Sequence, residues 1–224
     1  METANDNGVF FDHKRGSRLG LPEAIFCAGK SREALCGIIE EFGNKSLFFT
    51  RLTQEMHDSL PEELQARLHY HPLSQSAYTG LLQKRPFGSV AIVSAGTSDA
   101  PVVWETAKTL DFLGIRNALF EDCGVAGLWR ITSRIAEINT HSVVIVVAGL
   151  DAALASVLGG LTPRPLIAVP APTGYGIAKQ GETALCAMLA SCAPGVCVMN
   201  IGNGYGAACA AVRIINLLES SPRE

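Results

Sequence analysis

The sequence lacks the features of a membrane protein, a secreted disulfide-rich protein or a nucleic-acid-binding protein. Its most apolar stretches, residues 143–150 and 184–193, fall short of the roughly 18 to 20 residues that a spanning helix needs. Its N-terminus is polar and acidic, unlike a signal peptide. No Cys-X-X-Cys pair occurs, and the seven cysteines are scattered through apolar segments, which argues for free thiols in a reducing compartment. We therefore expect a cytoplasmic protein with no membrane partner.

Clustered positive charge is also missing. Basic residues never form a run longer than a pair, and the formal net charge is −3, so we expect no nucleic-acid partner. What the chain does have is apolar material, because 48% of its 224 residues are hydrophobic and only 17% are charged. That supply suffices for a large core.

Two regions of different character divide the sequence. Residues 1–83 mix charges, aromatic residues and helical patterns, whereas residues 84–224 alternate β-branched runs with glycine loops and alanine-rich helices. In the first region we expect a helix at 32–42 capped by Ser31, a strand at 46–50 and a short helix at 61–68. The pattern predicts a small N-terminal α/β unit, 1–83, joined to a larger α/β domain, 84–224.

Strands and helices alternate along the larger domain. The expected strands are residues 89–93, 117–120, 142–147, 166–169 and 195–200, and the expected helices are residues 102–113, 132–139, 152–158, 181–191 and 206–218. This alternation predicts a three-layer α/β domain of the Rossmann or flavodoxin-like type, with a parallel sheet between two layers of helices.

Glycine-containing loops follow four of the expected strands. They are residues 94–101, 122–127, 148–151 and 170–176. Ligands of such sheets bind beyond the carboxyl ends of the strands, and a helix that begins there offers free N–H groups to a phosphate. Residues 94–101 taken alone also fit an ordinary helix cap. The four loops together predict a ligand site.

Several motifs carry a resemblance to a known family. They are Ser94-Ala-Gly-Thr-Ser-Asp-Ala-Pro-Val102, Gly124-Val-Ala-Gly-Leu128, Gly174-Tyr-Gly176, Ser191-Cys-Ala-Pro-Gly195 and Asn203-Gly-Tyr-Gly-Ala-Ala208, with further matches between residues 12 and 51. The chain resembles the AIR carboxylase (PurE) superfamily. It is more similar still to the LarB-type pyridinium-3,5-biscarboxylic acid mononucleotide synthases of nickel-pincer cofactor assembly.

The resemblance implies an AIR carboxylase-like fold and a pyridinium nucleotide carboxylase/hydrolase. Such an enzyme carboxylates the pyridinium ring of nicotinic acid adenine dinucleotide at C5 and splits the phosphoanhydride to release AMP. A cationic pyridinium cannot attack carbon dioxide through C5. A cysteine thiolate that adds at C6 turns the ring into an enamine-like dihydropyridine, which can.

Cys192 matches the nucleophile position of that family, and Asp151 is the candidate base or metal ligand. A buried, inert cysteine is the alternative interpretation of Cys192. We expect the other cysteines to pack. The strand-end loops supply the candidate substrate-binding residues, which are Ser94, Gly96, Thr97, Ser98, Asp99, Gly124, Val125, Ala126, Gly127, Arg130, Gly149, Gly174, Tyr175 and Gly176.

Two further groups have both a functional and a structural interpretation. Asp12, Arg15 and Arg18, with His13, could close over the adenylate half of the dinucleotide, or could form an ordinary solvated segment. Tyr175 could stack on the pyridinium ring or could be an interface tyrosine.

Four positions depart from the family pattern. Trp129 stands where the motifs have histidine, Gly202 where they have aspartate, Asp151 where they have glutamate and Ala190 where they have asparagine. Two other functions therefore stay open. One is a divergent nucleotide-binding protein with altered or lost activity, and the other is an AIR carboxylase-like mutase, against which Trp129 argues because the mutase uses that histidine.

The resemblance also indicates partners. The substrates would be nicotinic acid adenine dinucleotide, or a related pyridinium nucleotide, and carbon dioxide or bicarbonate. The chain would form a homo-oligomer, by resemblance an octamer. Mg²⁺ is a candidate cofactor without assigned ligands, and no tightly bound organic cofactor is expected.

Overall fold

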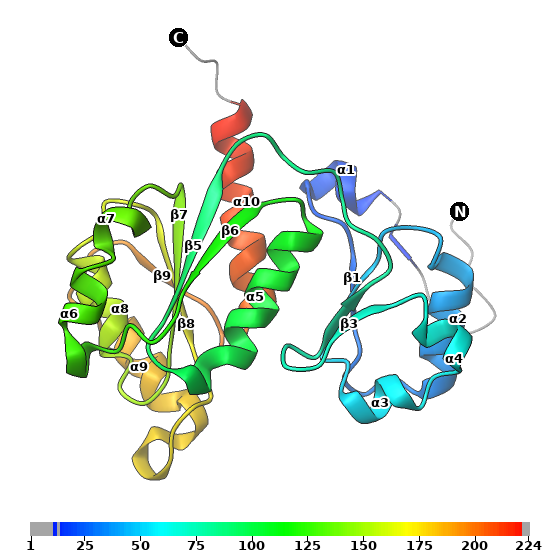
Figure 1. The fold of residues 1–224 in the computed structure, drawn as a ribbon, viewed down its shortest axis with the longest axis horizontal. Helices are drawn as coiled ribbons and strands as arrows, with labels where there is room; N and C mark the ends of the chain where they lie inside the picture. Colours follow the sequence, from blue (N-terminus) through cyan, green and yellow to red (C-terminus); the bar gives the residue numbers. More distant parts are fainter. Residues whose placement is uncertain (1–10, 13, 221–224) are drawn as a thin grey trace. The chain divides into compact units, whose positions relative to one another are not determined.

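The computed structural model describes residues 11, 12 and 14–220. The chain divides into two compact units, with the boundary between Gln83 and Lys84. Figure 1 shows the elements of each unit along the chain. No described helix combines the length and apolar character that crossing a membrane requires.

The first unit is a small mixed sheet with short helices. Its strands are β1 (Ala24–Phe26), β2 (Phe48–Thr50), β3 (His69–His71) and β4 (Ser76–Tyr78), in the order β1-β2-β4-β3, and its helices are α1 (Arg15–Leu19), α2 (Arg32–Phe42), α3 (Gln54–Asp58) and α4 (Glu62–Gln65). Strand β1 runs parallel to β2, and β4 runs antiparallel to both β2 and β3. Ser31 caps α2, as predicted, by accepting a hydrogen bond from the Ala34 N–H at 3.2 Å.

The second unit is an all-parallel sheet between two layers of helices. Its strands are β5 (Ser89–Ser94), β6 (Arg116–Phe120), β7 (Val143–Ala148), β8 (Leu166–Pro170) and β9 (Val196–Val198), in the order β6-β5-β7-β8-β9. Its helices are α5 (Ala100–Phe112), α6 (Trp129–Thr132), α7 (Ile135–Ile138), α8 (Ala153–Gly159), α9 (Glu182–Leu189) and α10 (Gly204–Ser220), with 3₁₀ turns η1 (Thr97–Asp99), η2 (Val125–Gly127) and η3 (Gly176–Gly181). This architecture confirms the predicted α/β fold class.

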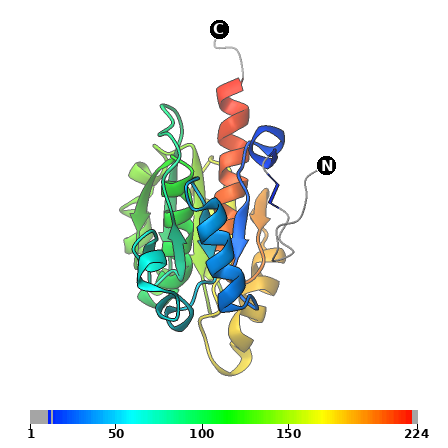
Figure 2. The ribbon, with the colours of Figure 1, turned by 90° about the vertical axis from the view of Figure 1, so that its right-hand side faces the viewer.

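Strand β7 lies in the middle of the sheet and is buried. All six of its residues are buried, as expected for a parallel strand that has helices on both faces. Helices α5 and α10 cover one face of the sheet, and α6, α7, α8 and α9 cover the other (Figure 1). In Figure 2 the long α10, in orange to red, is seen from the side.

Two expected helices differ from the structure. The expected helix at 132–139 is two short helices, α6 and α7, separated at Ser133 and Arg134. Ile131 and Ile138, one on each helix, are both fully buried in the core of the second unit. In the first unit, the expected helix at 61–68 is reduced to α4, because Leu68 leads directly into β3.

Candidate functional site

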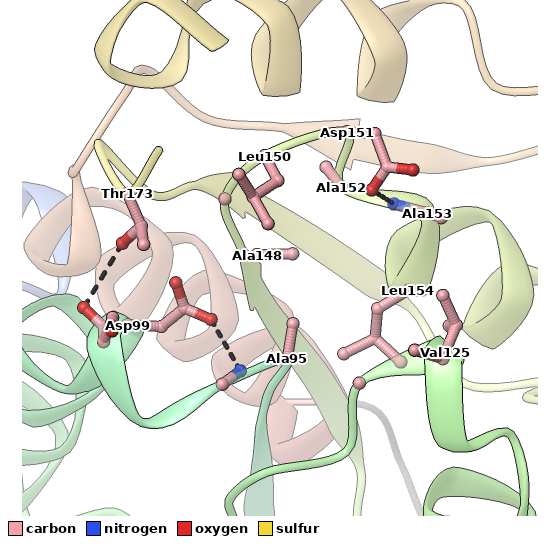
Figure 3. A pocket seen from close by; sticks show the side chains of 15 residues that line it. Ala95, Asp99, Val125, Ala148, Leu150, Asp151, Ala152, Ala153, Leu154 and Thr173 are labelled. Carbon is pink, nitrogen blue, oxygen red and sulfur yellow. Dashed lines mark hydrogen bonds between the residues drawn. The ribbon is translucent and has the colours of Figure 1, made fainter. Parts of the chain in front are cut away.

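A pocket of about 300 Å³ lies at the carboxyl ends of β5 and β7, where the fold predicts ligand binding. Three of the four predicted loops form most of it, and Thr173 contributes from the fourth. Figure 3 shows Asp99 and Thr173 on one side of the pocket, and Asp151, Leu154 and Val125 on the other. The lining residues are Ala95, Gly96, Ser98, Asp99, Gly124, Val125, Ala126, Ala148, Gly149, Leu150, Asp151, Ala152, Ala153, Leu154 and Thr173.

Asp99 is the buried carboxylate of this pocket. Only 3% of its surface is exposed, and its Oδ2 accepts a hydrogen bond from the Gly96 N–H at 2.9 Å. Burial raises the pKa of Asp99 above its usual value, and the hydrogen bond from the Gly96 N–H opposes that shift. The Thr173 hydroxyl donates to the Ser98 carbonyl at 3.2 Å, which ties two of the loops together (Figure 3). Asp99 is therefore held in a fixed position.

Asp151 is the exposed carboxylate on the opposite side. Its Oδ1 accepts from the Ala153 N–H at 3.3 Å, in the first turn of α8 (Figure 3). Its two neighbours, Leu150 and Ala152, have φ angles of +53° and +51°, a region that costs a non-glycine residue of order 1–3 kcal/mol. Gly149 avoids a further clash, because a Cβ there would lie 2.5 Å from the Thr173 carbonyl oxygen. Strained backbone on both sides of Asp151 therefore accompanies its position at the pocket wall.

The charge of the pocket is negative. Asp99 and Asp151 are its two charged groups, and among the described residues that line it none is Lys, Arg or His. Such a site favours a cationic ring or a hydroxylated sugar over a phosphate. The structure therefore revises the prediction for residues 94–101. Gly96, Ser98 and Asp99 line the pocket, whereas Ser94 is 1% exposed within β5 and Thr97 lies outside the lining.

Arg130 is the cation closest in sequence to the pocket wall, and it is paired. Its Nη1 lies 2.7 Å from Oδ2 of Asp122, and its Cζ lies 5.9 Å from the centre of the Trp129 ring. Gly127 is next to this pair but does not line the pocket. Asp122 begins a predicted strand-end loop, but no sequence motif indicated a role for it.

Gly174, Tyr175 and Gly176 form a separate surface hollow with Lys179, Gln180 and Glu182. Tyr175 is 88% exposed, and its loop extends away from the rest of the second unit in both views (Figures 1 and 2, yellow). The structure therefore does not place these three residues in the pocket with Asp99.

Cys192 lies at the amino ends of the strands, whereas the pocket lies at their carboxyl ends. Its loop connects α9 to β9, so it precedes a strand, whereas the pocket lies after strands. Helix α8 separates the two places. Its first residue, Ala153, lines the pocket, while its last, Gly159, has the Ala193 side chain beside it. Seven residues of helix span about 10 Å. Within one chain, the structure therefore does not place Cys192 among the residues that line the pocket with Asp151.

Cys192 is nevertheless exposed, and it is one of seven free cysteines. The hydroxyl of the preceding residue, Ser191, lies 2.8 Å from the Ser156 hydroxyl on α8, which anchors the loop. Within one chain, Cys192 is therefore not a buried packing residue.

The described predicted residues of the first unit form ion pairs within that unit. Arg18 Nη2 lies 2.5 Å from Oδ2 of Asp12, and Arg15 Nη1 lies 4.0 Å from Oε1 of Glu23. The hydrogen bond from Arg18 lowers the pKa of Asp12. His13 lies outside the described residues. The ion pairs fit the interpretation of a solvated charged segment.

A metal would find few ligands in the pocket. Within residues 11, 12 and 14–220, no group of three or more His, Cys, Asp or Glu side chains could hold an ion. Mg²⁺ therefore stays a prediction from the family resemblance, because the only carboxylates that line the described pocket, Asp99 and Asp151, lie on opposite sides of it.

Comparisons with known proteins agree with this architecture. Residues 89–224 match the AIR carboxylase family, and residues 6–80 match the LarB/PurE-like N-terminal domain. The chain is 32% identical, over 206 residues, to an uncharacterized protein of Methanocaldococcus jannaschii, and the match covers 88% of this chain and 79% of that protein. These matches indicate a carboxylase-type enzyme. The chain therefore belongs to the AIR carboxylase family, as a LarB-type member.

Proposed function

We propose that the protein carboxylates nicotinic acid adenine dinucleotide at C5 of the pyridinium ring and then hydrolyses its phosphoanhydride. One dinucleotide, one carbon dioxide and one water would give pyridinium-3,5-biscarboxylic acid mononucleotide and AMP, with release of a proton. The observation that carries the proposal is the negative pocket at the carboxyl ends of β5 and β7. It suits a cationic ring, in a chain whose family carboxylates small molecules.

The residues divide the carboxylation between them. The Cys192 thiolate adds at C6 of the ring, and the electron pair thus made available at C5 forms the bond to carbon dioxide. Asp151, exposed at the pocket wall, takes the C5 proton, and loss of the thiolate restores the aromatic ring. Asp99 is buried and held by the Gly96 N–H, so its role is to hold the ring cation and the ribose hydroxyls, while the exposed Asp151 exchanges the proton.

We infer that Cys192 comes from a second copy of the chain, because its loop precedes β9, whereas the pocket lies at the carboxyl ends of β5 and β7. Residues 183–212 contain no charged side chain, and they include the exposed Leu189 and the edge strand β9. An uncharged, partly apolar edge is a natural interface between subunits. We propose that this edge brings Cys192 of one subunit to the pocket of another in a homo-oligomer.

A nucleotide-binding protein without turnover is the second candidate. Gly202, where the family has aspartate, lies in a tight buried turn with φ +64°, and its N–H donates to the Pro170 carbonyl at 2.8 Å. One carboxylate is thus missing near the carboxyl end of β8. A protein that lacks the carboxylate needed for the hydrolytic step would bind the dinucleotide and release no AMP.

Mass spectrometry with isotopically labelled bicarbonate distinguishes these candidates. The protein is incubated with nicotinic acid adenine dinucleotide, labelled bicarbonate and Mg²⁺, beside the variants Cys192→Ala and Cys186→Ala. We expect label in a pyridinium mononucleotide together with free AMP, lost in Cys192→Ala and retained in Cys186→Ala, since Cys186 is an equally exposed thiol on α9. An unchanged dinucleotide that stays bound to the native protein would instead support the binding role.

A further inference from the structure

Trp129 is an exposed aromatic residue beside the pocket. Its side chain is 71% exposed, and it begins α6 two residues after η2, whose Val125 and Ala126 line the pocket. An indole costs free energy when it is left in water, so such exposure near a ligand site calls for an explanation.

The Trp129 ring is held in a defined arrangement. The Arg130 guanidinium lies over it, with Cζ 5.9 Å from the ring centre, and Asp122 fixes that guanidinium through a 2.7 Å ion pair. Gly127 makes room for the arrangement, because a Cβ there would lie 3.0 Å from Arg130 Nε and 3.4 Å from Trp129 Nε1. Three neighbouring residues thus order one face of the indole and leave most of the ring in solvent.

The size of the pocket leaves part of a dinucleotide outside. A volume of about 300 Å³ is at the lower end of the range for drug-sized ligands. It accommodates one nucleoside half, so the second base must lie on the surface near the rim. Trp129 offers an aromatic surface there.

Charge decides which base goes where. The cationic pyridinium is attracted by Asp99 and Asp151 in the pocket, whereas the Trp129 ring already has one cation, the Arg130 guanidinium, over it. A neutral purine needs no carboxylate and stacks well on an indole. The Arg130 guanidinium has five N–H donors, so it can keep Asp122 and still bind a phosphate.

We propose that Trp129 is the stacking platform for the purine base of the nucleotide ligand and that Arg130 binds the adjoining phosphate. The assignment rests on the proposed function, because it takes the ligand to be a dinucleotide with one neutral and one cationic base. It also gives Trp129, which replaces the histidine of the family motif, a role in specificity.

Tryptophan fluorescence tests the proposal directly. The chain has two tryptophans, so the variant Trp104→Phe reports on Trp129 alone. We expect AMP to quench this signal in a saturable manner, and ribose 5-phosphate, which lacks the base, to leave it unchanged. Calorimetry on the otherwise wild-type chain avoids the Trp104 substitution. There Trp129→Leu should weaken AMP binding about 10- to 100-fold, and Trp129→Phe should weaken it less.

The outcomes separate this proposal from the proposed function. Carboxylation without any AMP or dinucleotide effect on Trp129 would overturn the platform and leave the reaction standing. Quenching by AMP without carboxylation would support the platform and reject the reaction. A Trp129 signal that responds to protein concentration and to no nucleotide would also overturn it, because the indole would then lie between subunits.

Discussion

Burial divides five of the seven cysteines of this chain into two chemical classes. Cys27 and Cys123 are fully buried, whereas Cys186, Cys192 and Cys197 are exposed. Burial raises the pKa of Cys27 to about 12 and raises that of Cys123 as well. A thiol must ionise to act as a nucleophile, so the buried pair is inert near neutral pH.

Thiol labelling checks this division. At pH 8, iodoacetamide should modify the three exposed cysteines of the native protein and leave Cys27 and Cys123 unmodified until the protein is unfolded. Peptide mass spectrometry locates the label. Added nicotinic acid adenine dinucleotide should slow modification of Cys192 and not of Cys186. Equal rates for these two with and without the dinucleotide would contradict the role of Cys192.

Asp99 makes stability depend on pH. Its pKa is raised in the folded protein, chiefly by burial, so the fold binds the proton more tightly than the unfolded chain does. The free energy of unfolding therefore falls as pH rises from the ordinary aspartate pKa of 3.8 through the raised value. Asp99→Asn removes this dependence. The unfolding free energy of Asp99→Asn, relative to the wild type, should increase with pH across that window in urea titrations.

A control keeps that measurement specific. Ser98→Ala changes an exposed residue of the same pocket that does not titrate, so its unfolding free energy relative to the wild type should stay constant across the same pH range. If the difference between Asp99→Asn and the wild type stayed constant across the window, the raised pKa of Asp99 would be wrong.

At the scale of elements, α10 begins with three capped N–H groups. Glu105 on α5 is 3% exposed, and its Oε2 accepts from the N–H groups of Gly204 at 2.9 Å and Tyr205 at 3.3 Å. Asn203 Oδ1 accepts from the Gly206 N–H at 2.8 Å. A carboxylate at a helix N-terminus also interacts favourably with the helix dipole. These bonds fix α10 to α5.

Removal of this cap should destabilise the fold. Glu105→Ala leaves two N–H groups at a buried helix start without their acceptor, which costs about 1–3 kcal/mol for each unsatisfied group. Chemical denaturation measures the change. Glu137→Ala, an exposed glutamate on α7, is the matched control and should fall within about 0.5 kcal/mol of the wild type. A Glu105→Ala protein as stable as this control would mean that water replaces the carboxylate.

Among the strands and helices, some could be predicted from the sequence and others could not. The parallel strands were predictable because buried runs such as residues 89–93 and 142–147 are unbroken and β-branched. The three-residue strands β1, β3 and β4 were not, because pairing with neighbours rather than local pattern defines them. Helices α1 and α3, each of five residues, are too short for a periodic signal.

The candidate site was predictable to the extent that it follows strands. Gly96, Asp99, Gly124 and Asp151 come after predicted strands, and the structure brings them together. Cys192 comes before a predicted strand, so the same rule would have placed it at the other edge. Cys192 was assigned to the site from its match to the family motif, and not from its position relative to the strands. The pairing of Arg130 with Asp122 depends on side-chain directions that no spacing reveals.

At the scale of the whole molecule, the two parts of the proposed site, the pocket and Cys192, lie at opposite ends of the strands within one chain. The pocket belongs to the carboxyl edge of the parallel sheet, and the thiol of Cys192 belongs to the amino edge. If the reaction needs both, activity requires an assembly in which unlike edges meet. Such a contact is heterologous, and repeated around an axis it closes into a ring.

Mixed oligomers test this arrangement. Cys192→Ala keeps a complete pocket but supplies no thiol, and Asp99→Asn supplies a thiol but has a defective pocket, so each variant alone should be inactive. When the two are co-expressed with different tags and purified together, random assembly should restore about a quarter of wild-type specific activity, because half of the pockets are intact and half of those meet an intact Cys192.

The double variant Cys192→Ala/Asp99→Asn is the control, since its co-assembly with either single variant restores nothing if both groups are required. A site built within one chain predicts no recovery in any mixture, because every chain then lacks one of the two groups. Recovery that falls when mixed oligomers are diluted until they dissociate would tie activity to the contact itself. The ratio of restored to wild-type activity therefore decides whether the uncharged edge at residues 183–212 serves only to hold subunits together or also delivers the nucleophile.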